Sequence, residues 1–128
     1  FDARPKVIGT WKFLDDYSYE NMIYGYLYYA KFHRGKITKI EFPSGFDLSE
    51  FTIVRAADIP GKNIVPEPES DQLFLAENEI FYFGQIILGI AHPSKEILQN
   101  FVKNITVKYE ERSAITSPKQ CLDDEKNA

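Results

Sequence analysis

The chain has 128 residues, 44% hydrophobic and 15% aromatic, so it is long enough for one globular domain and is not disordered. Its net charge of −4 and isoelectric point near 5.2 argue against nucleic-acid binding through a positive surface. The single cysteine, Cys121, excludes a disulfide framework and a thiolate metal cluster, and it predicts a reducing, cytoplasmic compartment.

Neither a signal peptide nor a membrane span is predicted. The residues that follow Phe1 lack a basic region before an apolar stretch, which a signal peptide requires. The apolar run Ile86–Ala91 is far shorter than a membrane-spanning helix. The sequence therefore predicts a soluble protein that does not contact a membrane.

Alternating apolar residues predict three strands in the first part of the chain. Residues 10–14 alternate and would place Trp11 and Phe13 on one face, and residues 17–21 are typical of a turn. Residues 22–32 form a long aromatic and aliphatic run that predicts the second strand. In the third, 36–42, the two isoleucines are three positions apart, out of step with a period of two, which indicates a bulge.

The next part predicts a short strand and then a long loop. Residues 51–55 have strand character, but the chain must leave the sheet over 56–61 because Pro60 has no backbone donor and Gly61 suits a positive φ. Residues 62–78 are rich in proline, acidic and amide residues, which predicts a long surface loop that docks on something or carries function.

The last part predicts a strand–helix–strand unit. Residues 80–91 are apolar with a break at Gly84-Gln85, and a helix with Pro93 in its first turn follows. Residues 106–110 then alternate as a strand. The apolar face of the helix contains Ile97, Leu98, Phe101, Val102 and Ile105.

These elements predict an α+β fold with a mixed β-sheet and one main helix, the helix of the C-terminal strand–helix–strand unit. If its two strands share a sheet, the crossover is right-handed. Residues 1–117 form the predicted domain, and residues 118–128 are polar and charged, so they predict a linker.

Few residues offer chemistry. The chain lacks a glycine-rich phosphate loop, a zinc-binding His-Glu-x-x-His motif and a Gly-x-Ser-x-Gly nucleophile motif. His33 and His92 are too few ligands for a zinc site. Asp15 and Asp16 are adjacent, so on a strand they would point to opposite faces and could not share a proton. We therefore expect no catalytic, cofactor-binding or metal site within the chain.

Two clusters of side chains admit two interpretations each. Tyrosines at positions 24, 26 and 28 alternate, so they either form a row that stacks on a ligand or pack against the helix or a neighbouring domain; we favour packing. The basic cluster either holds a phosphate or is a solvated loop and strand edge, and we favour the second. Its members are Lys31, Arg34, Lys36 and Lys39.

The order of several short motifs resembles the hammerhead-type α/β domain that opens the molybdopterin-binding subunit of xanthine dehydrogenases and aldehyde oxidases. The resemblance runs from about Arg4 to about Ser117. Its motifs are Gly9–Asp16, Leu27-Tyr28, Gly35–Ile37, Ala57–Asn63, Leu75-Ala76, Phe83–Gln85 and Val107–Glu110. Two departures are the short connection Lys31–Gly35 and Ile86 in a place where the family often has proline, and they leave the subgroup and its substrate open.

The resemblance implies a fragment of an oxidoreductase that hydroxylates a heterocycle or an aldehyde at a molybdenum–pterin centre, with water as the oxygen source. Electrons would leave through iron–sulfur clusters and often FAD, carried by further domains or subunits that are the expected partners. The family's pterin-binding loops and its general-base glutamate lie in later domains. The isolated chain is therefore expected to be an inactive structural and interface domain.

Six residues in the matching motifs are predicted as interface elements on this resemblance. They are Asp58, Ile59, Pro60, Gly61, Gly84 and Gln85. Gln85 in particular is hypothesised to donate hydrogen bonds across a domain interface. Two rival functions remain: a free-standing ligand-binding module that uses the tyrosine row, and a small enzyme that uses Asp15, His33 or His92.

Overall fold

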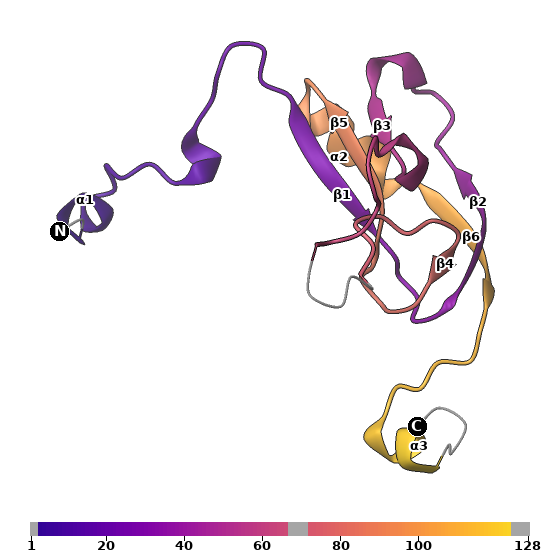
Figure 1. Cartoon of the computed structure of the whole chain (residues 1–128). Helices are drawn as coiled ribbons and strands as arrows, with labels where there is room; N and C mark the ends of the chain where they lie inside the picture. Colours follow the sequence, from indigo (N-terminus) through magenta and orange to yellow (C-terminus); the bar gives the residue numbers. More distant parts are fainter. Residues whose placement is uncertain (1–2, 67–71, 124–128) are drawn as a thin grey trace.

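Six strands form two separate three-stranded sheets, with one main helix packed beside them (Figure 1). The computed structural model describes residues 3–66 and 72–123. In chain order, with η for a short 3-10 helix, the elements are α1 Ala3–Val7, η1 Leu14–Asp16, β1 Tyr24–Tyr29, β2 Gly35–Glu41, η2 Leu48–Glu50, β3 Thr52–Val54, η3 Ala56–Asp58, β4 Glu79–Ile80, β5 Ile86–His92, α2 Lys95–Lys103, β6 Thr106–Glu111 and α3 Pro118–Asp123.

The predicted α+β class and the strand–helix–strand unit are confirmed, but the single mixed sheet is replaced by two antiparallel ones. The strand orders are β1-β5-β3 and β4-β2-β6, and every pairing between the described strands is antiparallel. The strands that flank α2 lie in different sheets. The helix therefore joins the two sheets, and the handedness rule for crossovers within one sheet does not apply.

The predicted bulge in β2 is present. The register with β6 shifts between Ile37 and Lys39, so one extra residue separates two isoleucines that both pack against the core. A bulge adds one residue to a strand, so two side chains three positions apart can point to the same face of the sheet. A second irregularity lies between Tyr28 and Tyr29 of β1, where it pairs with β5.

Helix α2, Lys95–Lys103, begins after the predicted start, in which Pro93 lies in the first turn. Ser94 is the N-cap, because its hydroxyl oxygen accepts from Ile97 N at 3.3 Å, and Pro93 precedes the cap instead of lying in the first turn. Of the predicted apolar face, Ile97 is 40% exposed and the other four residues are buried. The hydrophobic stripe that faces the core is thus narrower than the periodicity indicates.

The core is organised around Phe101 of α2, which is completely buried. Its ring centroid lies 4.1 Å from that of Phe51, 5.3 Å from that of Phe46 and 5.7 Å from that of Phe42. Phe51 directly precedes β3 of one sheet, and Phe42 directly follows β2 of the other. This aromatic cluster therefore packs the helix against both sheets at once.

The strand predicted at residues 10–14 is absent. Residues 3–23, here called the N-terminal arm, contain α1 and η1 and run away from both sheets (Figure 1). Trp11 and Phe13 are 41% and 60% exposed. Alternation of apolar residues predicts a strand only where a partner strand supplies backbone hydrogen bonds, and the arm lies beside neither sheet.

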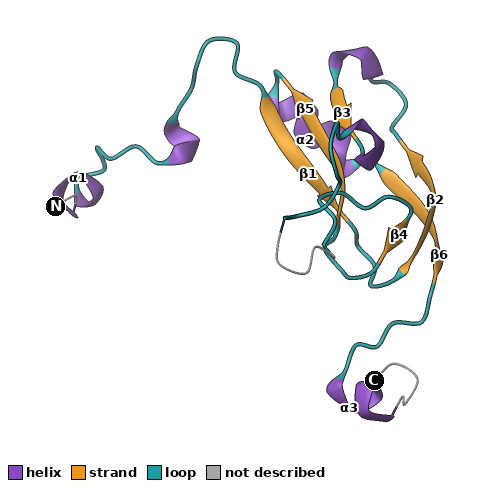
Figure 2. Cartoon of the chain, viewed as in Figure 1, coloured by secondary structure: helices purple, strands orange, loops and turns teal. Residues whose placement is uncertain are grey.

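The C-terminal segment leaves β6 as an extension that carries α3 (Figure 2). Part of the predicted linker, residues 118–123, is this short helix, and residues 124–128 lie outside the described residues. Among the described residues no helix is long and apolar enough to cross a membrane. The predicted domain boundary at residue 117 stays a prediction.

Replacing Phe101 by Ala should destabilise the domain by about 3 to 5 kcal/mol, because the change leaves a cavity in contact with three rings. Ile97→Ala on the same helix is the control and should cost less than about 1 kcal/mol, since that side chain is 40% exposed. Urea denaturation of the two variants and the parent chain measures both costs. Equal losses would show that the cluster around Phe101 is not the centre of the core.

Candidate interface surfaces

The six predicted interface residues lie in two connections, one after β3 and one between β4 and β5. The first connection contains Asp58–Gly61, here called the Asp58 loop. The second contains Gly84 and Gln85, which directly follow Phe81–Phe83, here called the aromatic turn. Neither turn is part of a strand ladder, so the side chains and backbone atoms around each turn must fix its shape.

In the Asp58 loop, the carboxylate of Asp58 closes the short helix η3. Its Oδ2 accepts from Arg55 N at 2.7 Å, while Asp58 N donates to Arg55 O at 3.0 Å. Ile59 N then donates to Ala56 O at 3.3 Å. Asp58, Pro60 and Gly61 are exposed and Ile59 is half-buried, so the loop presents a small, rigid surface.

Residues of η3 also line a hollow of the domain. This hollow measures about 570 Å³ and lies between β2, η3, residues 76–78 and the start of β5. Its two cationic side chains have partners: Lys39 pairs with Glu41 at 3.0 Å, and the Arg55 guanidinium lies over the Phe42 ring at 5.8 Å. Because both cations of this hollow already have partners, the hollow gives no support to a phosphate site.

Asn63, which the sequence reasoning missed, fixes the base of the long loop. Its side-chain amide donates to Leu75 O at 2.7 Å and its Oδ1 accepts from Leu75 N at 3.0 Å. Val65 N also donates to Gln72 O at 2.8 Å, so two segments on either side of residues 67–71 are joined. The side chain of an Asn can accept from a backbone N–H and donate to a backbone C=O at the same time. An Asn within a proline-rich loop was therefore the sequence feature that could have predicted this contact.

The aromatic turn is shaped by the two residues that follow it. Gly84 has φ of +87°, which a residue with a Cβ adopts only under strain, and its N–H donates to Ala30 O at 3.0 Å. The side-chain Oε1 of Gln85 accepts from Phe81 N at 2.9 Å, and Gln85 N donates to Tyr82 O at 3.3 Å. Gln85 is only 3% exposed, so its contacts lie inside the domain.

The aromatic turn itself faces outward. Phe81, Tyr82 and Phe83 are 58%, 46% and 59% exposed. They border a hollow of about 380 Å³ that is also lined by His33, Arg34 and residues 114–116. Three consecutive exposed aromatic rings on a hydrogen-bonded turn form an apolar surface of the kind that interface cores use.

The tyrosine row predicted on β1 does not form a stacking platform. Tyr28 is 5% exposed and its hydroxyl donates to Ile105 O at 3.2 Å, while Tyr24 packs against the core. Burial, and the nearby Tyr26 second, raise the pKa of the Tyr28 hydroxyl above its ordinary value. The packing interpretation is therefore confirmed for Tyr24 and Tyr28, and Tyr26 alone is exposed.

The residues considered for catalysis are not brought together. His92 is buried, with its Nδ1 accepting from Ser94 N at 2.9 Å, whereas His33 is exposed and its ring lies 5.5 Å from that of Phe83. In the N-terminal arm, Asp16 Oδ2 accepts from Phe13 N at 2.8 Å and so caps η1. Within the described ranges, no group of three or more His, Cys, Asp or Glu residues could hold a metal.

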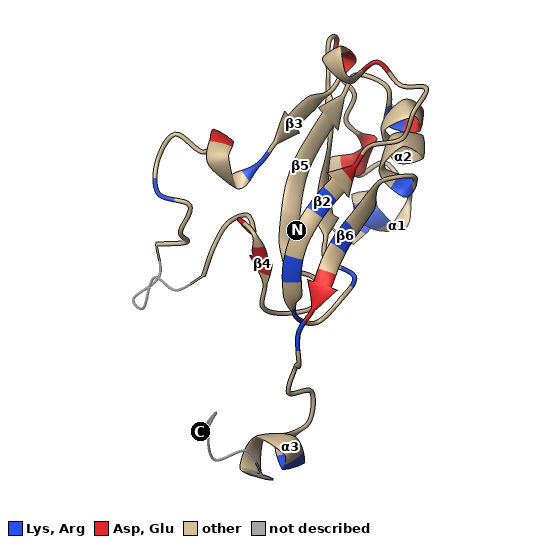
Figure 3. Cartoon of the chain, turned by 90° about the vertical axis from the view of Figure 1, so that its right-hand side faces the viewer, with Lys and Arg blue, Asp and Glu red and all other residues tan. Residues whose placement is uncertain are grey.

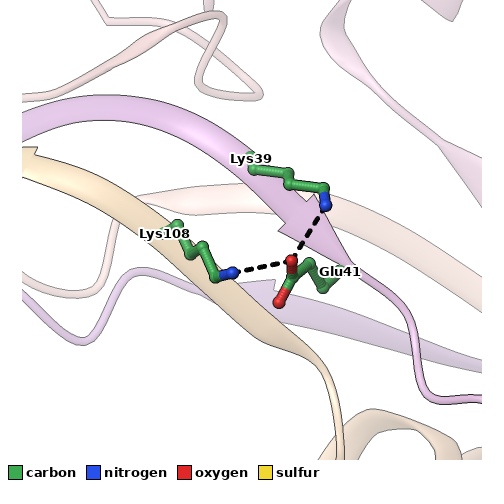
Figure 4. A network of polar contacts seen from close by, with 3 residues as sticks. All are labelled: Lys39, Glu41 and Lys108. Carbon is green, nitrogen blue, oxygen red and sulfur yellow. Dashed lines mark hydrogen bonds and ion pairs between the residues drawn. The ribbon is translucent and has the colours of Figure 1, made fainter.

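Charged residues of both signs are interspersed along β2 and β6, where the basic cluster partly lies (Figure 3). Lys39 and Lys108 both contact Glu41, at 3.0 and 2.8 Å (Figure 4). Hydrogen bonds from Lys108 first, and then from Lys39, hold the pKa of the Glu41 carboxyl below its ordinary value. Arg34 Nη1 donates to Ser113 O at 3.3 Å. These pairings favour the solvated strand edge over a phosphate site.

The fold is that of a two-sheet α+β domain. The profile described as "Aldehyde oxidase and xanthine dehydrogenase, a/b hammerhead domain" matches residues 8–113. The chain therefore belongs to that family of domains, as the order of its motifs predicts. The prediction that the chain is a hammerhead-type domain from the xanthine dehydrogenase and aldehyde oxidase group is confirmed.

Similar proteins are several times longer than this chain. It is 29% identical over 126 residues to a probable xanthine dehydrogenase subunit of Bacillus subtilis (strain 168), covering 94% of the chain and 16% of that protein. It is 26% identical over 134 residues to the nicotinate dehydrogenase large molybdopterin subunit of Eubacterium barkeri, covering 99% of the chain and 30% of that protein. The chain thus spans less than a third of either relative.

Solved structures share the fold. The aldehyde oxidoreductase of Desulfovibrio gigas superposes with a TM-score of 0.78 at 20% identity, over 99% of this chain and 15% of that one. Quinoline 2-oxidoreductase of Pseudomonas putida 86 superposes with a TM-score of 0.75 at 18% identity, over 95% of this chain and 17% of that one. In both, the domain is a small part of a longer chain.

Replacing Gln85 by Ala should destabilise the isolated chain by about 1 to 3 kcal/mol, because the Phe81 N–H loses its acceptor. Gln99→Ala, on the exposed side of α2, is the matched control and should change stability by less than about 0.5 kcal/mol. Urea denaturation measures the loss, and amide exchange at residues 81–84 should rise only in the first variant. A neutral Gln85→Ala would show that the turn holds its shape without this side chain.

Replacing Glu41 by Gln removes a charge and keeps an acceptor. Because the two lysines lower the folded-state pKa, the charge stabilises the domain above the unfolded carboxyl value near 4.5, and this contribution is lost as the pH falls through the folded value. We expect a lower Tm for Glu41→Gln at neutral pH and low salt, and a difference that disappears once the pH falls below the folded-state pKa of Glu41 or in about 1 M salt.

Thermal melts of Glu41→Gln, the parent chain and a Glu20→Gln control across this pH range measure the effect. Glu20 is exposed in the N-terminal arm, so its replacement should leave Tm unchanged at every pH. A Tm difference for Glu41→Gln that persists under acid would assign it to amide geometry instead of charge.

Proposed function

We propose that this chain is a non-catalytic structural and interface domain of the molybdopterin-binding subunit of a molybdenum hydroxylase. The observation that carries the proposal is its membership of the hammerhead family at about 15 to 17% of the length of the matching solved chains. A unit of this size, embedded in a much longer chain, has most of its neighbours in the same polypeptide.

The exposed aromatic turn supports an interface role. A free-standing domain commonly exposes apolar side chains singly, whereas Phe81, Tyr82 and Phe83 are exposed together on a turn that Gly84 and Gln85 hold in place. We propose this turn and the Asp58 loop as contacts with the remaining domains of the subunit. Gln85 would act indirectly in such a contact, because its Oε1 serves its own turn.

The parent enzyme is proposed to hydroxylate a heterocycle or an aldehyde with water as oxygen donor, and to pass electrons to iron–sulfur clusters and, in some members, to flavin. When bound, the molybdenum–pterin centre supplies the oxidative hydroxylation. Among the described residues, the two cations of the hollow beside η3 already contact Glu41 and Phe42, so this hollow gives no support to a site for such a group. We therefore assign the cofactor to other domains, and propose a cytoplasmic location for the assembly.

The matching proteins act on different substrates by name, including xanthine, nicotinate, quinoline and an aldehyde. The proposal therefore extends to the class of oxidation and not to a single substrate. The buried position of Tyr28 and the packing of Tyr24 give no support to the alternative of a ligand-binding module built on the tyrosine row.

The proposal predicts that the purified 128-residue chain binds no molybdenum and oxidises neither xanthine nor nicotinate nor an aldehyde. The full polypeptide that carries it should bind molybdenum and oxidise a substrate of this class. Phe83→Ser in the full polypeptide should raise amide exchange at residues 81–85, because the proposed contact lies within that polypeptide, and Ile97→Ser, also an exposed apolar position, is the control. Metal analysis, activity assays and amide hydrogen exchange make the measurements. Molybdenum binding or turnover by the isolated chain would contradict the proposal.

A further inference from the structure

We propose that the N-terminal arm is a docking strap that binds an apolar groove on another domain of the same long polypeptide. This inference rests on the proposed function and adds a second, separate contact to it. The arm joins the hammerhead domain at β1, and Figure 1 shows it running away from both sheets. Its binding surface must therefore be supplied from outside this domain.

The arm carries a high density of exposed apolar side chains for its length. Leu14 is 89% and Val7 85% exposed, so these side chains are almost fully hydrated in the isolated domain. Such exposure is unfavourable unless a partner covers it. The exposed apolar and aromatic residues of the arm are Val7, Ile8, Trp11, Phe13, Leu14, Tyr17, Tyr19 and Ile23.

Local contacts hold the arm in a defined shape although it has no core of its own. Pro5 O accepts from Thr10 N at 2.9 Å and from Trp11 N at 3.1 Å, which folds the chain back after α1. Phe13 N donates to Asp16 Oδ2, and the rings of Tyr17 and Tyr19 stack at 6.2 Å. A segment that is already shaped loses less conformational entropy when it binds than an unstructured one does.

The arm belongs to the fold that this family shares. The family match begins at residue 8 and so includes most of the arm, and the aldehyde oxidoreductase superposition covers 99% of this chain. In that solved structure the corresponding region is 15% of a longer chain, whose remainder is available to cover an arm. This favours an occupant within the same polypeptide over a second copy of the domain.

The chemistry of the arm defines its partner surface. Trp11, Phe13 and Leu14 follow one another within four positions and require adjoining apolar pockets in an extended groove. Lys12 lies over the Tyr17 ring at 5.8 Å and the Asp16 carboxylate caps η1, so these two charges are engaged within the arm, while Asp15 is exposed beside Leu14. The groove that receives these three side chains should therefore be apolar along its floor.

The test compares Leu14→Ser with Leu122→Ser in the full polypeptide that carries this chain. Both leucines lie in short helical segments and are 89% and 84% exposed, so neither change should alter the Tm of the 128-residue chain. Hydrogen exchange should be much slower at residues 10–20 in the full polypeptide than in the 128-residue chain, where the local hydrogen bonds of the arm protect these amides weakly. Leu14→Ser should reduce that protection by about 10- to 100-fold, and Leu122→Ser should leave it unchanged.

The outcomes separate this inference from the proposed function. An arm that exchanges freely in a full polypeptide that still binds molybdenum overturns the strap and leaves the proposed function intact. Protection of the arm in the 128-residue chain that rises with protein concentration identifies a second copy as the occupant and also overturns it. A full polypeptide that binds no molybdenum, with its arm protected and sensitive to Leu14→Ser, supports the strap and contradicts the proposed function.

Discussion

The packing of Phe101 against rings from both sheets is the contact on which the rest of the domain depends. Each sheet has three strands, and a sheet this small needs a covered apolar face to be stable. Helix α2 joins β5 of one sheet to β6 of the other, and its buried face covers the junction. The hydrogen bond from the Tyr28 hydroxyl to Ile105 O ties β1 to the same junction. The aromatic cluster around Phe101 therefore fixes the position of the two sheets relative to each other.

A core placed at this junction leaves the ends of the domain exposed. The aromatic turn, the Asp58 loop and the N-terminal arm all lie outside the cluster around Phe101 and are shaped by short-range hydrogen bonds. Residues that stabilise the fold and residues available for contacts are thus largely different ones. This separation allows surface residues to change with the neighbouring domain without loss of the core.

Local features could be predicted from the sequence, and long-range ones could not. The helix and its flanking strands follow from periodicity, and the bulge from the spacing of Ile37 and Ile40, because both are properties of neighbouring residues. The division into two sheets depends on which strands pair, and residues 10–14 have a strand pattern but no partner strand. Asn63 was missed because its partner, Leu75, lies twelve residues away. The sequence indicated the aromatic turn through Gly84 and Gln85, and the exposure of its three rings was not predicted.

Gln85 is a buried polar residue whose hydrogen bonds lie within its own turn. Its Oε1 accepts from Phe81 N, and a side chain 3% exposed has little surface left for a partner. Burying an amide is favourable only when its hydrogen bonds are made, so the contact with Phe81 N helps to fix Gln85 in one conformation. The same bond fixes the backbone from which Phe81, Tyr82 and Phe83 project. Gln85 thus helps to hold three exposed aromatic rings in one arrangement.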